Sequence, residues 1–131
     1  MEKFGSDSPF ISFLGPDLIE WRDGYIQVGF DLRPELMNRA GILHGGVTSA
    51  ILDHVGGMCG LYSDDPANPV YGVTLNLNVN FLSPGGTGRV IATGTRVKSG
   101  RSVFFSEMTL MDGETLIATA TGVFKLNKSH R

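Results

Sequence analysis

An amide, an imidazole, two adjacent glycines and a carboxylate lie within one short segment whose other residues are typical of a buried helix. In chain order, they are Asn38, His44, Gly45, Gly46 and Asp53. Packing alone does not require an aspartate in such a helix. Because the first turn of a helix has free backbone N–H groups, polar groups around it can polarise a carbonyl and deliver water to it. The segment therefore indicates acyl-transfer chemistry.

The helix that would carry the carboxylate is predicted to run from Gly45 to about Tyr62 and to end at the Asp64-Asp65-Pro66 cluster. Its apolar stripe, expected to face a sheet, consists of Val47, Ile51, Val55, Met58 and Tyr62. Asp53 lies off this stripe, and its helical neighbours are Gly46, Ala50, Gly57 and Gly60. Each interior glycine costs about 1 kcal/mol relative to alanine. Two explanations remain open: close packing against a partner's backbone, or a slot for a slender ligand beside the carboxylate.

Alternating polar and apolar residues predict strands on both sides of this helix. Before it, the pattern from Leu18 to Leu32 predicts an extended segment or hairpin with its turn at Asp23-Gly24. After it, apolar residues from Val73 to Phe81 alternate with Thr74 and three asparagines, a period of two. Further strands are expected over about residues 88–98, 101–111 and 114–126, joined by hairpins at Ser99-Gly100 and Asp112-Gly113. We predict that the four strands after the helix form an antiparallel meander.

The predicted organisation is a lead-in over residues 1–16, one domain over 17–127 and a polar tail over 128–131. In the lead-in, Phe10, Phe13 and Leu14 could dock on a core. One helix cannot cover both faces of the predicted sheet, and the edges of the sheet remain unpaired. We therefore predict an obligate oligomer.

The composition argues against several other classes of protein. The 131 residues suffice for one domain with a real core, and 41% hydrophobic residues are usual for a globular chain. A formal net charge of -2 gives no electrostatic reason to bind nucleic acid or an anionic membrane. The one cysteine, Cys59, excludes an internal disulfide framework, and the N-terminus lacks the features of a signal peptide. We expect a cytoplasmic protein that binds neither nucleic acid nor membranes.

The chain resembles the hotdog-fold acyl-CoA thioesterases, and specifically their PaaI-like branch. Asn38, the His44-Gly45-Gly46 triplet, Asp53 and the strand that ends in Leu82-Ser83-Pro84 carry the resemblance, which extends over residues 18–126. It implies an α+β hotdog fold, in which a curved antiparallel sheet of five to six strands wraps one long helix. It also implies a homodimer whose two sheets are continuous across the interface, often paired again into a tetramer. Each active site would lie between subunits.

The same resemblance implies a role for each matched residue. Asp53 would act as the general base or as a nucleophile on the thioester carbonyl, and the backbone N–H of Gly45 would polarise that carbonyl. Asn38 would orient the attacking water or the thioester, and His44 would support the leaving sulfur or fix its loop. Thr74 takes the position of a hydroxyl that helps to hold the water, where relatives have serine.

The substrate that the resemblance implies is an acyl-CoA, aryl or aliphatic. No metal or other cofactor is expected, because a thioester is already an activated acyl group. The hairpin over residues 98–102 resembles the region where relatives contact the pantetheine arm and the nucleotide phosphates. An exposed basic hairpin is also consistent with simple solvation. The candidate substrate contacts are Gly46 at the start of the helix and four residues of this hairpin: Lys98, Gly100, Arg101 and Ser102.

Two other functions remain open. A dehydratase or hydratase of the same fold uses a different arrangement of His with Asp or Glu, and a non-catalytic sensor would bind acyl-CoA without turnover. A metal site built from His44, Asp53 and His54 matches no known ligand spacing, and His54 is expected on the surface or at an interface. The sequence contains no Gly-x-Ser-x-Gly motif, which argues against a serine hydrolase.

Overall fold

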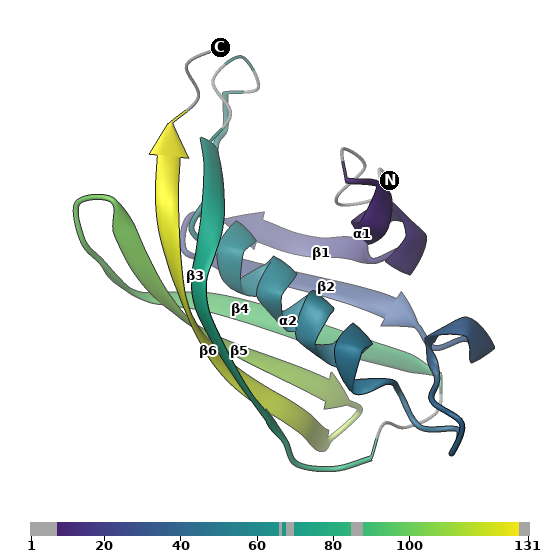
Figure 1. Ribbon diagram of the computed structural model, residues 1–131. Coiled ribbons are helices and arrows are strands. Elements are labelled where there is room, and N and C mark those ends of the chain that lie inside the picture. Colours follow the sequence, from purple (N-terminus) through teal and green to yellow (C-terminus); the bar gives the residue numbers. More distant parts are fainter. Residues whose placement is uncertain (1–7, 66, 68–69, 85–87, 129–131) are drawn as a thin grey trace.

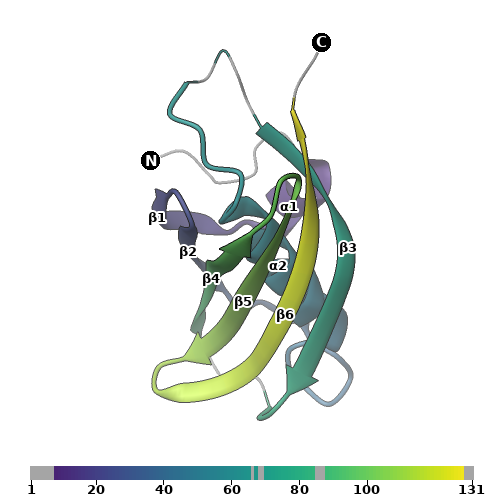
Figure 2. The same ribbon diagram turned by 90° about the vertical axis from the view of Figure 1, so that its left-hand side faces the viewer.

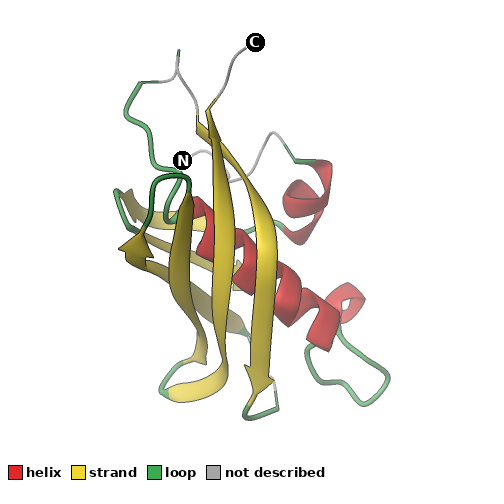
Figure 3. Ribbon diagram, turned by 60° about the vertical axis from the view of Figure 1, so that its left-hand side comes forward, coloured by secondary structure: helices red, strands yellow, loops and turns green. Residues whose placement is uncertain are grey.

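A single antiparallel sheet of six strands curves around one long helix (Figures 1 and 2). The computed structural model describes residues 8–65, 67, 70–84 and 88–128. Its elements are α1 (Pro9–Leu14), β1 (Asp17–Arg22), β2 (Tyr25–Asp31), the 3-10 turn η1 (Pro34–Leu36), α2 (Gly45–Met58), β3 (Val70–Phe81), β4 (Arg89–Ser99), β5 (Val103–Asp112) and β6 (Thr115–Lys128). Figure 3 shows helix α2 against one face of the sheet. The α+β hotdog arrangement expected from the sequence is confirmed.

The strand order is β1-β2-β4-β5-β6-β3, so the predicted four-strand meander is wrong. Strands β4, β5 and β6 do follow one another as neighbours, but β3 pairs with β6 at the far edge of the sheet. Helix α2 carries the chain across the sheet between β2 and β3. The place beside β2 is taken by β4, which leaves β1 and β3 as the two edges.

Strand β3 contains a β-bulge that changes the direction of one polar side chain. The register pairs Thr74 with Phe124 but Asn76 with Val123, so Leu75 is an extra residue on this strand. Because Phe124 is buried beneath the helix, Thr74 opposite to it faces the helix as well. A strict period of two would place Thr74 with the asparagines on the other face. The bulge makes that expectation wrong.

Helix α2 ends at Met58, about one turn earlier than predicted, where the carbonyl groups of its last residue and of the C-cap Cys59 bind the β1–β2 hairpin. The indole Nε1 of Trp21 donates to the carbonyl oxygen of Met58 at 3.0 Å, and the N–H of Gly24 donates to that of Cys59 at 2.9 Å. The buried helix face is also rotated from the predicted stripe. It consists of Thr48, Ile51, Leu52, Val55 and Gly56.

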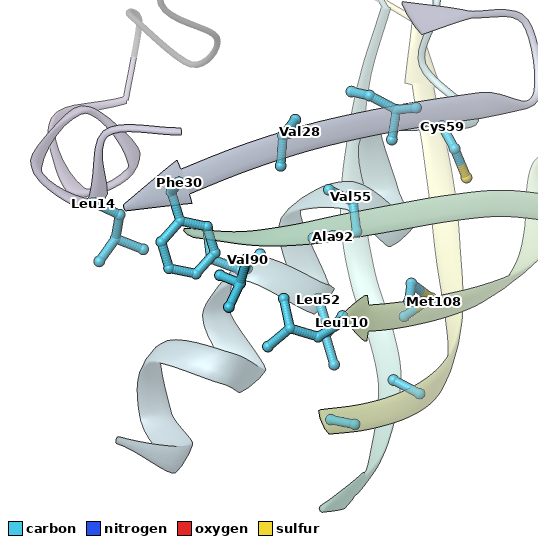
Figure 4. Close-up of a cluster of buried hydrophobic side chains, with 14 of the residues drawn as sticks. Leu14, Val28, Phe30, Leu52, Val55, Cys59, Val90, Ala92, Met108 and Leu110 are labelled. Carbon is cyan, nitrogen blue, oxygen red and sulfur yellow. The ribbon is translucent and has the colours of Figure 1, made fainter. Parts of the chain in front are cut away.

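The core fills the space between α2 and the sheet (Figure 4). Leu52 and Val55 of the helix lie among Val28, Ala92 and Leu110 of the sheet, and each of these side chains is 0% exposed. Burial of such aliphatic side chains is the main favourable contribution to folding. This packing fixes the helix, and therefore the residues on its other face, relative to β3.

Replacing Gly94 with alanine is expected to lower the free energy of unfolding by about 1–3 kcal/mol, because α2 passes directly over this residue of β4. A Cβ atom at Gly94 would lie 2.2 Å from the carbonyl oxygen of Val55, and backbone cannot move aside cheaply. Urea denaturation measures the change. At the next, exposed position, Thr95→Ala should alter stability by less than about 0.5 kcal/mol. Equal stability of Gly94→Ala and the wild type would contradict this close approach.

The lead-in contains helix α1, which docks only in part as predicted. Leu14 is buried in the core, but Phe10 and Phe13 are 56% and 57% exposed, so their expected docking is wrong. A short helix can turn only one side toward the core, and here that side presents Ile11 and Leu14. Arg33 covers part of the other side, with its guanidinium 5.0 Å from the ring centre of Phe13. No helix within the described ranges is long and apolar enough to cross a membrane.

Candidate active site

The carboxylate of Asp53 is paired with the hydroxyl of Thr74. Oγ1 of Thr74 donates a hydrogen bond of 2.7 Å to Oδ1 of Asp53, which joins the middle of α2 to the edge strand β3. The bulge in β3 makes this contact possible, because it turns Thr74 toward the helix. Asp53 is partly buried. Among the described residues, none donates a hydrogen bond to its second oxygen, Oδ2, which can therefore accept a proton from water.

This pair stands at the wall of a pocket of about 150 Å³ between α2, β3 and the inner face of the sheet. The rings of Phe104 and Phe124 are stacked there, with centres 5.4 Å apart. The lining consists of Asp53, His54, Gly57, Met58, Leu61, Gly72, Val73, Thr74, Phe104 and Phe124. A carboxylate and a hydroxyl in a mainly apolar pocket are suited to act on a substrate with an apolar group.

His54 lines the same pocket and is partly buried within the chain, so the expected surface position is wrong, while the expected interface position stays a prediction. Burial in this apolar site disfavours the charged imidazolium and lowers the pKa of His54 to about 4. The residue is therefore neutral at neutral pH. Strand β3, Leu61 and the rings of Phe104 and Phe124 enclose the side of α2 next to Asp53, and a helical wheel does not show these neighbours.

Stability is expected to fall in acid because of His54. Its folded-state pKa of about 4 lies below the ordinary histidine pKa of 6.5, so between these pH values the unfolded chain binds a proton that the folded chain does not. The contribution of His54 to the free energy of unfolding is complete above pH 6.5 and is lost as the pH falls toward 4. The loss amounts to about 3 kcal/mol. Urea titrations over this range measure it, and His54→Gln should flatten the dependence. Parallel pH profiles for the two proteins would exclude this role.

The N-terminus of α2 is capped by His44, whose Nδ1 accepts a hydrogen bond of 2.8 Å from the N–H of Gly46. The next two N–H groups, of Val47 and Thr48, both donate to the carbonyl oxygen of His44. The first N–H of the helix, that of Gly45, has no acceptor in the part of the chain that the structure describes. One backbone donor at the positive end of the helix dipole is thus available to a ligand.

Asn38 shapes the loop that leads into this helix. Its Oδ1 accepts hydrogen bonds from the N–H groups of Ala40 and Ile42, at 2.9 and 3.1 Å. The residue is exposed, and its amide nitrogen donates no hydrogen bond to a described residue.

A second pocket, of about 360 Å³, adjoins the helix start and includes Gly45 and Phe81.

Within one chain, the two halves of the candidate site are far apart. Asp53 follows Gly45 by eight residues on the same helix. At a rise of 1.5 Å per residue, the two are about 12 Å apart along the helix axis. One carbonyl group cannot contact both the Gly45 N–H and the Asp53 carboxylate of a single chain. The structure therefore brings together Asp53 with Thr74, and His44 with Gly46, as two separate groups.

Comparison with known proteins identifies the family. Residues 40–119, more than half of the chain, match the thioesterase superfamily. The chain belongs to this superfamily. The protein PA0474 of Pseudomonas aeruginosa is 34% identical over 122 residues, which cover 91% of this chain and 89% of that protein. The medium/long-chain acyl-CoA thioesterase YigI of Escherichia coli is 28% identical over 137 residues, which cover 94% and 88%.

The fold of this thioesterase superfamily member is similar to that of a solved structure. The conserved protein PA5202 from Pseudomonas aeruginosa superposes with a TM-score of 0.83 at 25% identity, covering 92% of this chain and 94% of that one. No cluster of three or more His, Cys, Asp or Glu side chains that could hold a metal occurs among the described residues of this chain.

The hairpin between β4 and β5 of this thioesterase superfamily member is exposed, and it carries Lys98, Gly100, Arg101 and Ser102. It is closed by a hydrogen bond of 2.6 Å from the N–H of Gly100 to the carbonyl oxygen of Val103. The hairpin leads directly into the strand that carries Phe104, a pocket residue.

Sequence reasoning missed the pocket floor in addition to His54. Phe104, Phe124 and Leu61 are far apart in the sequence, and none of them belongs to a polar motif. Their position in the strands could have indicated them, because residues alternate between the two faces of a strand and Phe104 and Phe124 are on the inward face.

Proposed function

We propose that this member of the thioesterase superfamily hydrolyses an acyl-CoA to the free acid and CoA, and that it belongs to the PaaI-like branch. The observation that carries the proposal is the hydrogen-bonded pair of Asp53 and Thr74 at the wall of a mainly apolar pocket. Such a pair can hold and deprotonate one water molecule. The name of the relative YigI, an acyl-CoA thioesterase, supports the same class of substrate.

In the proposed reaction, a water molecule held by Asp53 and Thr74 attacks the carbonyl carbon of the thioester. The carboxylate of Asp53 accepts a proton from this water, while the N–H of Gly45 stabilises the negative charge on the carbonyl oxygen. The carbon–sulfur bond then breaks, and the leaving CoA sulfur takes up the proton. Direct attack by Asp53 would instead form a mixed anhydride, which water then hydrolyses, and it would require the same two residues.

Asn38 and His44 have supporting roles in this proposal. The cap that His44 forms holds the first turn of α2, so that the N–H of Gly45 has a fixed direction. The amide nitrogen of Asn38 can donate to the attacking water or to the thioester. Gly46 contributes through the shape of this turn, because its own N–H is bound to His44.

The 12 Å separation leads to an active site between two protomers, in which Asp53 of one chain faces Gly45 of the other. Strand β3 is the edge through which two chains would join, because Tyr71, Val73 and Leu75 are 54%, 50% and 56% exposed on it. An exposed apolar edge strand readily pairs with a second strand. Two copies joined in this way would have one continuous sheet, and a dimer of such dimers is also part of the proposal.

The hairpin with Lys98 and Arg101 is proposed to contact the phosphates of CoA, and Gly100 and Ser102 the pantetheine arm. Both basic side chains are exposed, as contacts to a solvated phosphate require. Contacts of this kind should weaken as salt increases.

A thiol-release assay over short, medium, long-chain and aryl acyl-CoAs tests the proposed function. Release of CoA thiol with saturable kinetics supports hydrolysis. Binding of acyl-CoA without thiol release would instead identify a sensor, and addition of water to an enoyl-CoA would identify a hydratase. Either of these results would overturn the proposal.

A further inference from the structure

One of the glycines that line the pocket beside Asp53, Gly57, is not explained by packing within the chain. Three glycines, Gly56, Gly57 and Gly60, lie in or just after the last turn of α2. Glycine lowers helix stability relative to alanine in such positions. Each of the three therefore needs a physical reason.

Packing against the core explains two of these glycines. A Cβ atom at Gly56 would lie 2.6 Å from Cε of Met108, and one at Gly60 would lie 2.4 Å from the ring of Phe104. Both distances are shorter than contact allows. Any larger residue would displace the side chains beneath the helix.

Gly57 differs from its neighbours. A Cβ atom there would come no closer than 3.5 Å to the ring of Phe124, which is an ordinary contact. Gly57 lines the pocket and follows Asp53 by four residues, so it is the next residue along the same face of the helix. A Cβ atom at this position would fit the fold but would occupy space beside the carboxylate.

We infer that Gly57 determines which acyl groups this site accepts, by keeping the pocket beside Asp53 open for a compact apolar group about the size of a benzene ring. In another protein, an apolar cavity of about 150 Å³ lined by Leu, Ile and Phe binds benzene. The pocket here has about 150 Å³ and a floor of Phe104, Phe124 and Leu61. This inference rests on the proposed function, because it names the acyl group of the same site.

The test compares the wild type with Gly57→Ala and Gly57→Val on acetyl-CoA and benzoyl-CoA. The ratio of kcat/KM for benzoyl-CoA to that for acetyl-CoA should fall about 10–200-fold in Gly57→Ala, the range for one methylene group in a tight pocket. The fall should be larger in Gly57→Val. Thr95→Ala, an exposed substitution on β4, should leave the ratio as in the wild type.

Thermal unfolding and the oligomeric state provide a second readout. Gly57→Ala should melt at the same temperature as the wild type or higher, with an unchanged oligomeric state, because alanine favours the helix. A lower melting temperature or loss of the oligomer would show that packing, in the chain or against a partner, requires this glycine, and would overturn the inference. An unchanged ratio would also overturn it and leave the proposed function intact. Absence of thiol release by the wild type from every acyl-CoA would instead refute the proposed function itself.

Discussion

Replacing Asp53 with asparagine is expected to lower kcat for acyl-CoA hydrolysis by about 10²–10⁴-fold. Asparagine has nearly the same shape as aspartate, and its carbonyl oxygen can still accept the hydrogen bond from Thr74 that is 2.7 Å long in the wild type. It cannot accept a proton from water at neutral pH, nor can it form an anhydride. The fold and the pocket should therefore persist while the chemical step is lost. Steady-state thiol release measures the effect.

The matched control is Glu107→Gln, which removes a carboxylate from an exposed position of β5. It changes the net charge in the same way, and its kcat should equal that of the wild type. Circular dichroism and the melting temperature establish that the Asp53 variant is folded. Activity of Asp53→Asn close to that of the wild type would remove Asp53 from the chemistry.

Replacing Gly45 with proline is expected to lower kcat by about 10²–10³-fold, the usual effect of losing one oxyanion donor. Proline is favoured at the first position of a helix, where its missing N–H breaks no intrahelical hydrogen bond. The preceding residue, His44, already has the extended conformation that precedes proline, with φ -62 and ψ 134. The substitution thus removes the donor and keeps the helix.

Gly45→Ala separates loss of the donor from added bulk. It retains the N–H and adds only a Cβ atom, which would lie 3.4 Å from the ring of Phe81. Its kcat should be much closer to that of the wild type than to that of Gly45→Pro. Equal losses in the two variants would mean that space at Gly45, and not its N–H, is what the reaction needs.

Local patterns in the sequence predicted most of the fold. The turn at Asp23-Gly24, the helix start at Gly45 and the hairpins after β4 and β5 each depend on neighbouring residues, and all are present. The position of β3 beside β6 depends on which edge is free after the helix crosses the sheet. No local pattern reports that, and the predicted meander was wrong for this reason.

The candidate site was predictable in its polar residues but not in its geometry. The sequence showed that Asp53 needs an explanation, because its neighbours are small. The contact with Thr74 depends on a bulge at Leu75, where no glycine or proline marks the irregularity. The pocket position of His54 depends likewise on elements distant in sequence. Tertiary packing, and not local preference, determines these features.

The most direct test of the account mixes Asp53→Asn chains with Gly45→Pro chains. If each site takes its carboxylate from one protomer and its N–H from the other, every mixed dimer contains one site with both groups intact. After random exchange of subunits, two nearly inactive proteins should together regain about a quarter of the wild-type rate. If the mixture stays as inactive as its components although native mass spectrometry shows mixed dimers, the active site does not lie between protomers, and the central claim is wrong.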